Sequence, residues 1–160
     1  MQSLTDEVLI AMTEALAKWA KRRHMEWYTN VHVPWIKKAR ISFVCLNRKT
    51  RRIIVVYVAR EINENIIKIA RKFVFMADEV YCIASRHLYG KTIRKFSGIG
   101  VGILDYDPDR VFQVKIIGRY KKGAKPSVLD EPKDRFIAIL DSLEPGGVIC
   151  TFGWKKEQGG

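Results

Sequence analysis

The chain has 160 residues, of which 48% are hydrophobic and 29% are charged, so it can bury one sizeable core and is not an extended disordered polypeptide. Its 29 lysines and arginines exceed its 17 acidic residues by 12, which makes a polyanion the expected partner, nucleic acid before an acidic membrane surface. No apolar run reaches the length of about 18 residues that a membrane-spanning helix needs, so no spanning segment is expected, and nucleic acid rather than a membrane is the predicted partner.

The first expected element is a helix that begins after Thr5 and ends at the basic sequence KRRH, residues 21–24. Its apolar residues recur every three or four positions, and the acidic residues in its first turn suit the positive end of the helix dipole. Two strands rich in β-branched and aromatic residues are expected next, at 26–33 and 39–47.

The second of these strands is followed by the polar sequence RKTR (48–51) and by an apolar strand at 52–60, which together predict an antiparallel hairpin. The apolar spacing then changes to that of an amphipathic helix over 63–77, with Asn63 as its cap. The compact apolar sequence 78–85 is typical of a strand that returns beside the previous one and parallel to it.

Two more strands and a helix are expected in the remainder of the chain, at 98–107, 110–120 and 129–143. No internal repeat and no low-complexity linker divides the sequence. The pattern therefore predicts a single α/β domain over residues 1–160, in which a mixed central sheet is flanked by helices.

The residues that most often bind metals or act as nucleophiles are scattered. Cys45, Cys82 and Cys150 lack the paired spacing and the clustered histidines of a zinc site. His32, which stands between two valines, is expected on a sheet face rather than as a catalytic base. Buried reduced thiols and an amino terminus unlike a signal peptide favour a cytoplasmic protein.

The order of the first six elements, αβββαβ, resembles the PD-(D/E)xK nuclease-like fold of restriction endonucleases and Holliday-junction resolvases. The sequence KARISFVCLNRKTRRIIVVYVARE (38–61) resembles the family's hairpin, in which an Arg-x-Asp strand pairs with a strand that ends in Glu-x-Lys. MADEVYCIAS (76–85) and SGIGVGILDYD (97–107) resemble the strands beyond it. The resemblance covers about residues 5–120 and implies a restriction-endonuclease-like core, with residues 121–160 as a carboxyl-terminal extension.

In active members of that family, the Asp and the Glu bind a divalent metal and the Lys assists the attacking water, because two carboxylates hold a hard cation that polarises phosphate. In the matching register, the Asp position is Ser42, the Glu position is Tyr57 and the Lys position is Ala59. A hydroxyl, an uncharged phenol and a methyl group cannot replace these ligands. The resemblance therefore implies a degenerate site without catalytic residues, metal or other cofactor.

A displaced acidic site is the alternative. A shift of four residues along the third strand keeps the face and makes Glu61 the acid. Glu26, Glu64 and Asp78 could then join Glu61 in a metal-dependent DNA endonuclease that uses Mg²⁺ or Mn²⁺. The plainer interpretation is that Glu61 is a solvated residue at the end of a strand and that Glu64 is a helix-start charge.

Clusters of cations at loops and element ends are the main functional signal. Nucleic-acid contacts are predicted for Lys21, Arg22, Arg23, Lys37, Lys38, Arg40, Arg48, Lys49, Arg51, Arg52, Arg86, Lys91, Arg94 and Lys95. A fifth basic cluster comprises Arg119, Lys121, Lys122 and Lys125. Lysine and arginine supply sequence-independent contacts to phosphate, and aromatic residues near the clusters can stack on exposed bases.

The leading hypothesis is a non-catalytic nuclease-fold protein that binds nucleic acid, DNA before RNA, in an accessory or regulatory role. The nuclease with a displaced site is the second hypothesis. The third is a protein–protein interaction module or an inhibitor of a nucleic-acid machine, in which the clusters form no shared surface. Homodimers are common in that superfamily, so the resemblance also implies a homodimer as a candidate assembly.

Overall fold

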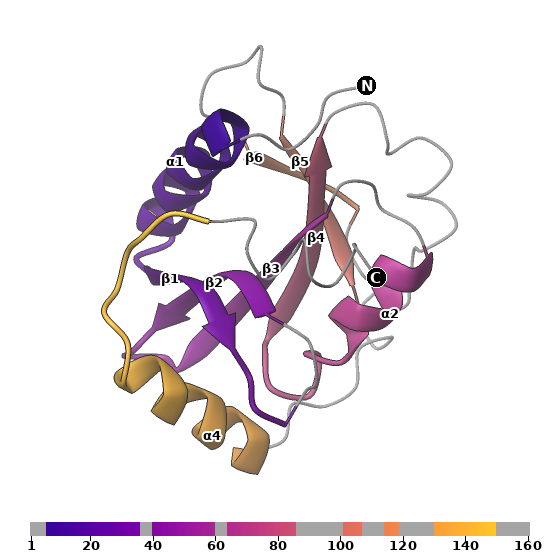
Figure 1. Cartoon of the computed structure of the whole chain (residues 1–160). Helices are drawn as coiled ribbons and strands as arrows, with labels where there is room; N and C mark the ends of the chain where they lie inside the picture. Colours follow the sequence, from indigo (N-terminus) through magenta and orange to yellow (C-terminus); the bar gives the residue numbers. More distant parts are fainter. Residues whose placement is uncertain are drawn as a thin grey trace.

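The computed structural model describes residues 6–35, 40–59, 64–85, 101–106, 114–118 and 130–149. It shows a mixed α/β structure around one six-stranded sheet, whose strands lie side by side in chain order (Figure 1). The elements are α1 (Asp6–Arg22), β1 (Glu26–His32), β2 (Arg40–Asn47), β3 (Arg52–Ala59), α2 (Glu64–Arg71), β4 (Glu79–Ser85), β5 (Gly102–Tyr106), β6 (Val114–Gly118) and α4 (Asp130–Asp141).

The sheet is mixed. β1, β2 and β3 form an antiparallel meander, β4 and β5 run parallel to β3, and β6 returns antiparallel to β5. The predicted hairpin and the predicted parallel return of β4 are both confirmed. Parallel neighbours need a crossover connection, and the segment that contains α2 supplies it.

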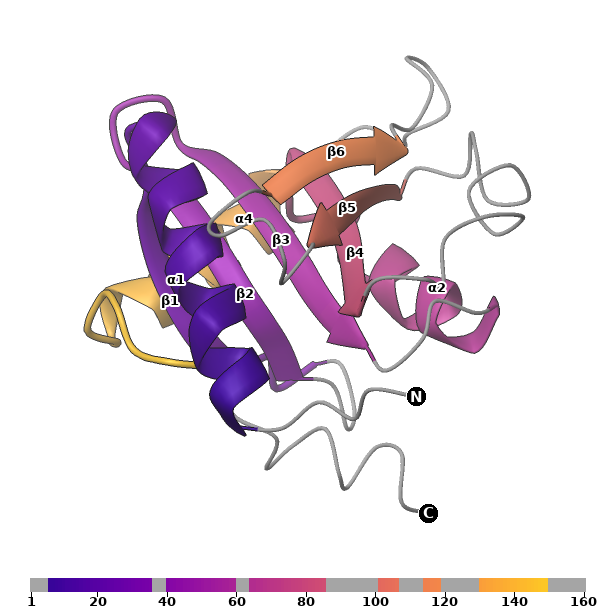
Figure 2. The ribbon, with the colours of Figure 1, turned by 90° about the horizontal axis from the view of Figure 1, so that it is seen from above.

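Helices cover both faces of the sheet. α1 lies on one face, and α2 and α4 lie on the other (Figure 2). β3 separates the two layers, because Ile54, Val56 and Val58 pack toward α1 while Val55 and Tyr57 pack toward α2 and α4. A strand buried on both faces needs a continuous apolar sequence, which explains the unbroken run in β3.

The carboxyl end of α1 has a specific cap. The backbone N–H of Met25 donates to the carbonyl of Ala20 (3.0 Å), and the N–H of His24 donates to the carbonyl of Lys21 (3.0 Å). His24 has a left-handed backbone with φ of 59°. This pair of bonds is a Schellman motif, in which glycine is the usual residue at the His24 position.

α2 is shorter than the predicted helix but its apolar face is as expected, with Ile66, Ala70, Phe73 and Val74 buried. Beyond Arg71 the backbone continues in tighter turns, in which the N–H groups of Lys72, Phe73, Val74 and Met76 donate to the carbonyl three residues earlier. These turns keep the apolar residues against the sheet until β4 begins.

α4 and the segment after it pack against β1 and the core. Phe136 and Leu140 of α4 are fully buried. The segment that follows runs beside β1, where Gly146 forms a parallel bridge with Tyr28 and its N–H donates to the carbonyl of Trp27 (2.7 Å). This segment therefore covers an edge of the sheet.

Within the described ranges, no helix combines the length and the apolar character that crossing a membrane requires.

Candidate functional site

The three positions that correspond to the family's metal site are occupied by structural side chains. The backbone N–H of Val58 donates to Oγ of Ser42 (3.0 Å), so this hydroxyl joins β2 to β3. Tyr57 is 1% exposed and Ala59 is fully buried, both in the core beneath α2 and α4. These residues serve packing and backbone pairing.

The sheet is irregular beside Ser42. Asn30 of β1 lies between the paired positions Thr29–Phe43 and Val31–Ile41, and it has a left-handed φ of 54°. Tyr28 and Val31 both contact the core on the α2 and α4 side, although simple alternation places residues three apart on opposite faces. The alternation of side chains therefore shifts by one residue at Asn30.

Two acids of the displaced-site alternative have cationic partners near the start of β3. Oε2 of Glu26 accepts a hydrogen bond from the hydroxyl of Tyr28 (2.9 Å) and pairs with Nε of Arg48 (3.2 Å). Oδ2 of Asp78 accepts bonds from the N–H of Ile53 (2.8 Å) and from Nζ of Lys133 (3.0 Å). These two carboxylates stabilise the hairpin end of the sheet.

Glu61 and the side chain of Glu64 lie outside the described residues. Asp78 contacts Ile53, which lies six residues before Ala59 on β3. Asp78 is therefore about 20 Å along the strand from the position that corresponds to the family's lysine. Among the residues that the structure describes, no three His, Cys, Asp or Glu side chains are grouped as metal ligands.

The arginines of the β2–β3 hairpin are paired with carboxylates. Arg48 donates to Oδ1 of Asp141 (2.6 Å), Arg51 donates to Oδ1 of Asp134, and Arg52 donates to Oε2 of Glu79 (3.1 Å). The hydrogen bonds of Arg48 to Asp141, then to Tyr28 and Glu26, raise the pKa of its guanidinium. The hairpin is thereby joined to α4, and much of its predicted charge is neutralised.

The cations at the end of α1 have a different environment. Lys21, Arg22 and Arg23 are exposed, and none of them forms an ion pair with a carboxylate in the described part of the chain. Nζ of Lys21 lies 5.4 Å from the ring centre of Trp27, and the guanidinium of Arg23 lies 4.4 Å from that of Trp19. Aromatic rings orient these cations but leave their positive charge in place.

A second basic surface was missed from sequence. Lys68, Arg71, Lys72 and Phe75 are exposed, and their spacing of three or four residues places them along one side of α2 and the turns that follow. We name these four residues the α2 stripe. The recurrence of cations at positions i, i+3 and i+4 is the sequence signal for this surface, and the same pattern is typical of the polar face of any amphipathic helix.

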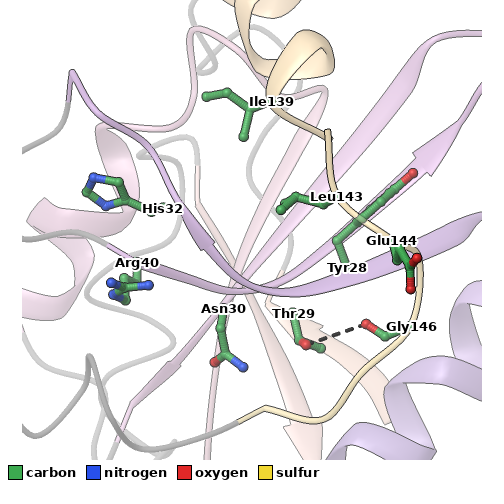
Figure 3. A pocket seen from close by; sticks show the side chains of 9 residues that line it. All are labelled: Tyr28, Thr29, Asn30, His32, Arg40, Ile139, Leu143, Glu144 and Gly146. Carbon is green, nitrogen blue, oxygen red and sulfur yellow. Dashed lines mark hydrogen bonds between the residues drawn. The ribbon is translucent and has the colours of Figure 1, made fainter. Parts of the chain in front are cut away.

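A pocket opens where β1 and β2 meet α4 and the segment after it (Figure 3). It brings the predicted contact residue Arg40 together with His32, its cross-strand partner. The volume is about 360 Å³. The lining residues are Tyr28, Thr29, Asn30, His32, Arg40, Ile139, Leu143, Glu144 and Gly146.

The other predicted contact residues fall outside the described ranges. They are Lys37, Lys38, Arg86, Lys91, Arg94 and Lys95, and the fifth basic cluster, Arg119, Lys121, Lys122 and Lys125, lies outside these ranges as well. Lys49 is described and lies in the hairpin turn, where its N–H donates to Oδ1 of Asn47 (3.0 Å).

Comparisons with known proteins show a similar fold in a solved structure but assign the chain to no family. No family model and no curated protein matches the chain. A solved structure of a protein of unknown function from Silicibacter pomeroyi is similar, with a TM-score of 0.58 and 12% sequence identity over 88% of this chain and 87% of that chain. The likeness extends over most of both chains and concerns the arrangement of the backbone.

Proposed function

We propose that this chain is a non-catalytic nucleic-acid-binding protein with a PD-(D/E)xK nuclease-like core, and that it binds DNA in an accessory or regulatory role. The order α1-β1-β2-β3-α2-β4 and the antiparallel hairpin followed by a parallel strand support the fold. The use of Ser42, Tyr57 and Ala59 for packing and backbone pairing supports the loss of metal chemistry.

One observation carries the binding function: the described cations fall into two classes. Arg48, Arg51 and Arg52 are offset by carboxylates of the same chain. The end of α1 and the α2 stripe present exposed cations for which no ion pair with a described carboxylate is found. Cations of the second class can replace the counterions of a phosphate backbone, and they give sequence-independent affinity that falls as salt rises.

The two basic surfaces lie on elements that cover opposite faces of the sheet. A single DNA segment that contacts one of them is therefore not expected to contact the other without wrapping around the protein. The end of α1 is the primary proposed surface, because it combines three successive cations with the rings of Trp19 and Trp27.

Fluorescence anisotropy with labelled double-stranded and single-stranded DNA tests this function. We expect the logarithm of the binding constant to fall linearly with the logarithm of salt concentration between about 50 and 200 mM, with a slope of about −0.9 per phosphate contact on duplex DNA. The variant Lys21→Gln/Arg22→Gln should bind several-fold more weakly and should show a shallower slope. The variant Lys68→Gln/Arg71→Gln measures separately how much the α2 stripe contributes to DNA binding.

Arg51→Gln/Arg52→Gln is the matched control, since it removes the same net charge from arginines that are already paired. An equal effect of the control and of the α1 variant would show that only the total charge matters and would contradict the proposed surface. Weak binding with no salt dependence would favour a protein–protein interaction module.

The nuclease alternative has its own measurement. Plasmid, single-stranded and branched DNA are incubated with the protein in Mg²⁺ or Mn²⁺. Metal-dependent cleavage that disappears in Glu61→Ala would replace the non-catalytic proposal with a displaced acidic site.

A further inference from the structure

We propose that the pocket between β1, β2 and α4 is a nucleotide site, which binds a phosphate monoester joined through a sugar to a flat base. A free mononucleotide and the phosphorylated end of a strand present the same chemistry to this pocket. The second source rests on the proposed function, whereas the first does not require it.

The pocket has the size and the mixed lining of a small-molecule site. Its volume of about 360 Å³ falls within the range of about 300–1,000 Å³ that is usual for ligand pockets. Ile139 and Leu143 of α4 and its extension provide an apolar wall, and β1 and β2 provide polar groups. Such pockets typically combine apolar walls with a few polar groups that orient the ligand.

The polar groups are divided between two sides. Figure 3 shows His32 and Arg40 together on one side of the pocket, with Leu143 and Glu144 toward the other. Arg40 and His32 are adjacent across the β1–β2 pair, so a guanidinium and an imidazole meet on one side. A guanidinium matches the geometry of phosphate oxygens and can donate two parallel hydrogen bonds.

The β1 side of the pocket is held by contacts to the segment after α4. Nδ2 of Asn30 donates to the carbonyl of Val148 (3.0 Å), and the hydroxyl of Thr29 donates to the carbonyl of Gly146 (3.5 Å). A Cβ atom at Gly147 would lie only 2.7 Å from Oγ1 of Thr29, so the segment is closely seated. Asn30 has a left-handed backbone with φ of 54°, which asparagine adopts more readily than most non-glycine residues, and this turns its side chain toward Val148.

These features select a ligand with distinct ends. The anionic group is placed at Arg40 and His32, and the flat ring lies against Ile139 and Leu143. The carboxylate of Glu144 disfavours a second anionic group on its side and accepts a hydrogen bond from a hydroxyl or an amino group. A nucleoside monophosphate satisfies all three requirements.

Isothermal titration calorimetry with adenosine 5′-monophosphate, adenosine and inorganic phosphate tests the site. We expect saturable binding of the monophosphate and binding at least tenfold weaker for adenosine and for phosphate alone. Arg40→Gln should weaken the monophosphate at least tenfold and leave adenosine unchanged. Leu143→Ser, at a side chain that is already 41% exposed, should weaken both the monophosphate and adenosine.

Arg135→Gln is the matched control, because Arg135 lies on α4 outside the pocket lining and pairs with Glu131. It should bind the monophosphate as the wild type does. Thermal unfolding of each variant verifies that the fold is retained. Failure of the monophosphate to bind saturably, or equal binding by wild type and Arg40→Gln, would overturn the proposal.

A 5′-phosphorylated octanucleotide and its 5′-hydroxyl counterpart distinguish the two sources. If the phosphorylated strand competes with adenosine 5′-monophosphate and the hydroxyl strand does not, the pocket binds strand ends. If neither strand competes with the monophosphate, the pocket binds free nucleotides. The same titration with Lys21→Gln/Arg22→Gln separates this site from the proposed DNA surface, since mononucleotide binding should persist when binding through α1 is lost.

Discussion

The side chain of Ser42 supports the sheet through a hydrogen bond to the backbone of the neighbouring strand. Its hydroxyl accepts the N–H of Val58 at 3.0 Å in a partly buried position. Replacement by alanine leaves that donor without its partner, and the expected cost is about 1–3 kcal/mol of the free energy of unfolding. Urea denaturation measures it.

Ser142→Ala is the control for this change, because the hydroxyl of Ser142 donates to the carbonyl of Ile139 at an exposed position. We expect a loss below about 0.5 kcal/mol for the control, since water can replace the hydrogen bond. Similar losses for the two variants would show that the Ser42 contact is not special.

His24 offers a stabilising substitution. Its left-handed φ of 59° in the cap of α1 strains a residue that has a Cβ atom, and glycine adopts the same backbone at little cost. His24→Gly is therefore expected to raise the free energy of unfolding by about 0.5–1 kcal/mol in urea denaturation, because the relief of about 1–2 kcal/mol of left-handed strain exceeds the greater entropy of glycine in the unfolded chain. Glu14 is exposed in the middle of α1, where glycine is unfavourable. Glu14→Gly should therefore lower the free energy of unfolding by a similar amount.

At the scale of elements, the hairpin and α4 are joined by ion pairs of unequal strength. Arg48 contacts Asp141, Glu26 and Tyr28, whereas Arg51 is shown with one exposed carboxylate, that of Asp134. We expect Arg48→Gln to lower the free energy of unfolding by about 1 kcal/mol and Arg51→Gln to lower it by less than about 0.5 kcal/mol.

Denaturation in low and high salt checks this order. The difference between wild type and Arg48→Gln should shrink as salt rises, because these side chains are about half exposed and salt screens exposed pairs. A larger effect of Arg51→Gln would contradict the network at Arg48.

The elements from α1 to β4 could be predicted from sequence because each carries its own periodicity. The apolar faces of α1 and α2 recur every three or four residues, and β3 is apolar throughout. The parallel return of β4 followed from the helix between two apolar strands. Local signals of this kind are present in every short window of the chain.

The partners of the hairpin arginines could not be predicted in this way. Arg48 and Asp141 are 93 residues apart, and Arg51 and Asp134 are 83 residues apart. No local pattern indicates that α4 returns to the hairpin, so the sequence by itself favours contacts between these cations and phosphate. The pocket beside Arg40 escaped prediction for the same reason, because its apolar wall is formed by α4 and its extension.

For the molecule as a whole, the thiols of Cys45 and Cys82, which are buried in the described part of the chain, make the free energy of unfolding depend on pH in the alkaline range. Burial raises the pKa of Cys82 to about 12 and also raises that of Cys45. Both thiols stay protonated in the folded protein, whereas in the unfolded chain they ionise near their ordinary value of 9.0. Their contribution to stability is therefore complete below about pH 9 and is lost as pH rises toward 12.

We expect the free energy of unfolding to fall above about pH 9, with each thiol contributing up to about 1.4 kcal/mol per pH unit. Desolvation, followed by the hydrogen bond to Glu26, raises the pKa of Tyr28 and adds to the decline above its ordinary value of 10.0. Urea denaturation at several pH values measures the slope. Cys82→Ala should make the slope shallower, and an unchanged slope would contradict the role of this thiol.

The segment after α4 has a consequence for how the molecule behaves in a crowded solution. An outer strand with open peptide groups is a template on which another chain can add its own strand, and this is a common beginning of aggregation. In this protein, the bridge from Gly146 to Tyr28 and the hydrogen bond from Asn30 to Val148 engage the outer side of β1. Residues 146–148 therefore protect β1 from sheet growth with a segment of the same molecule.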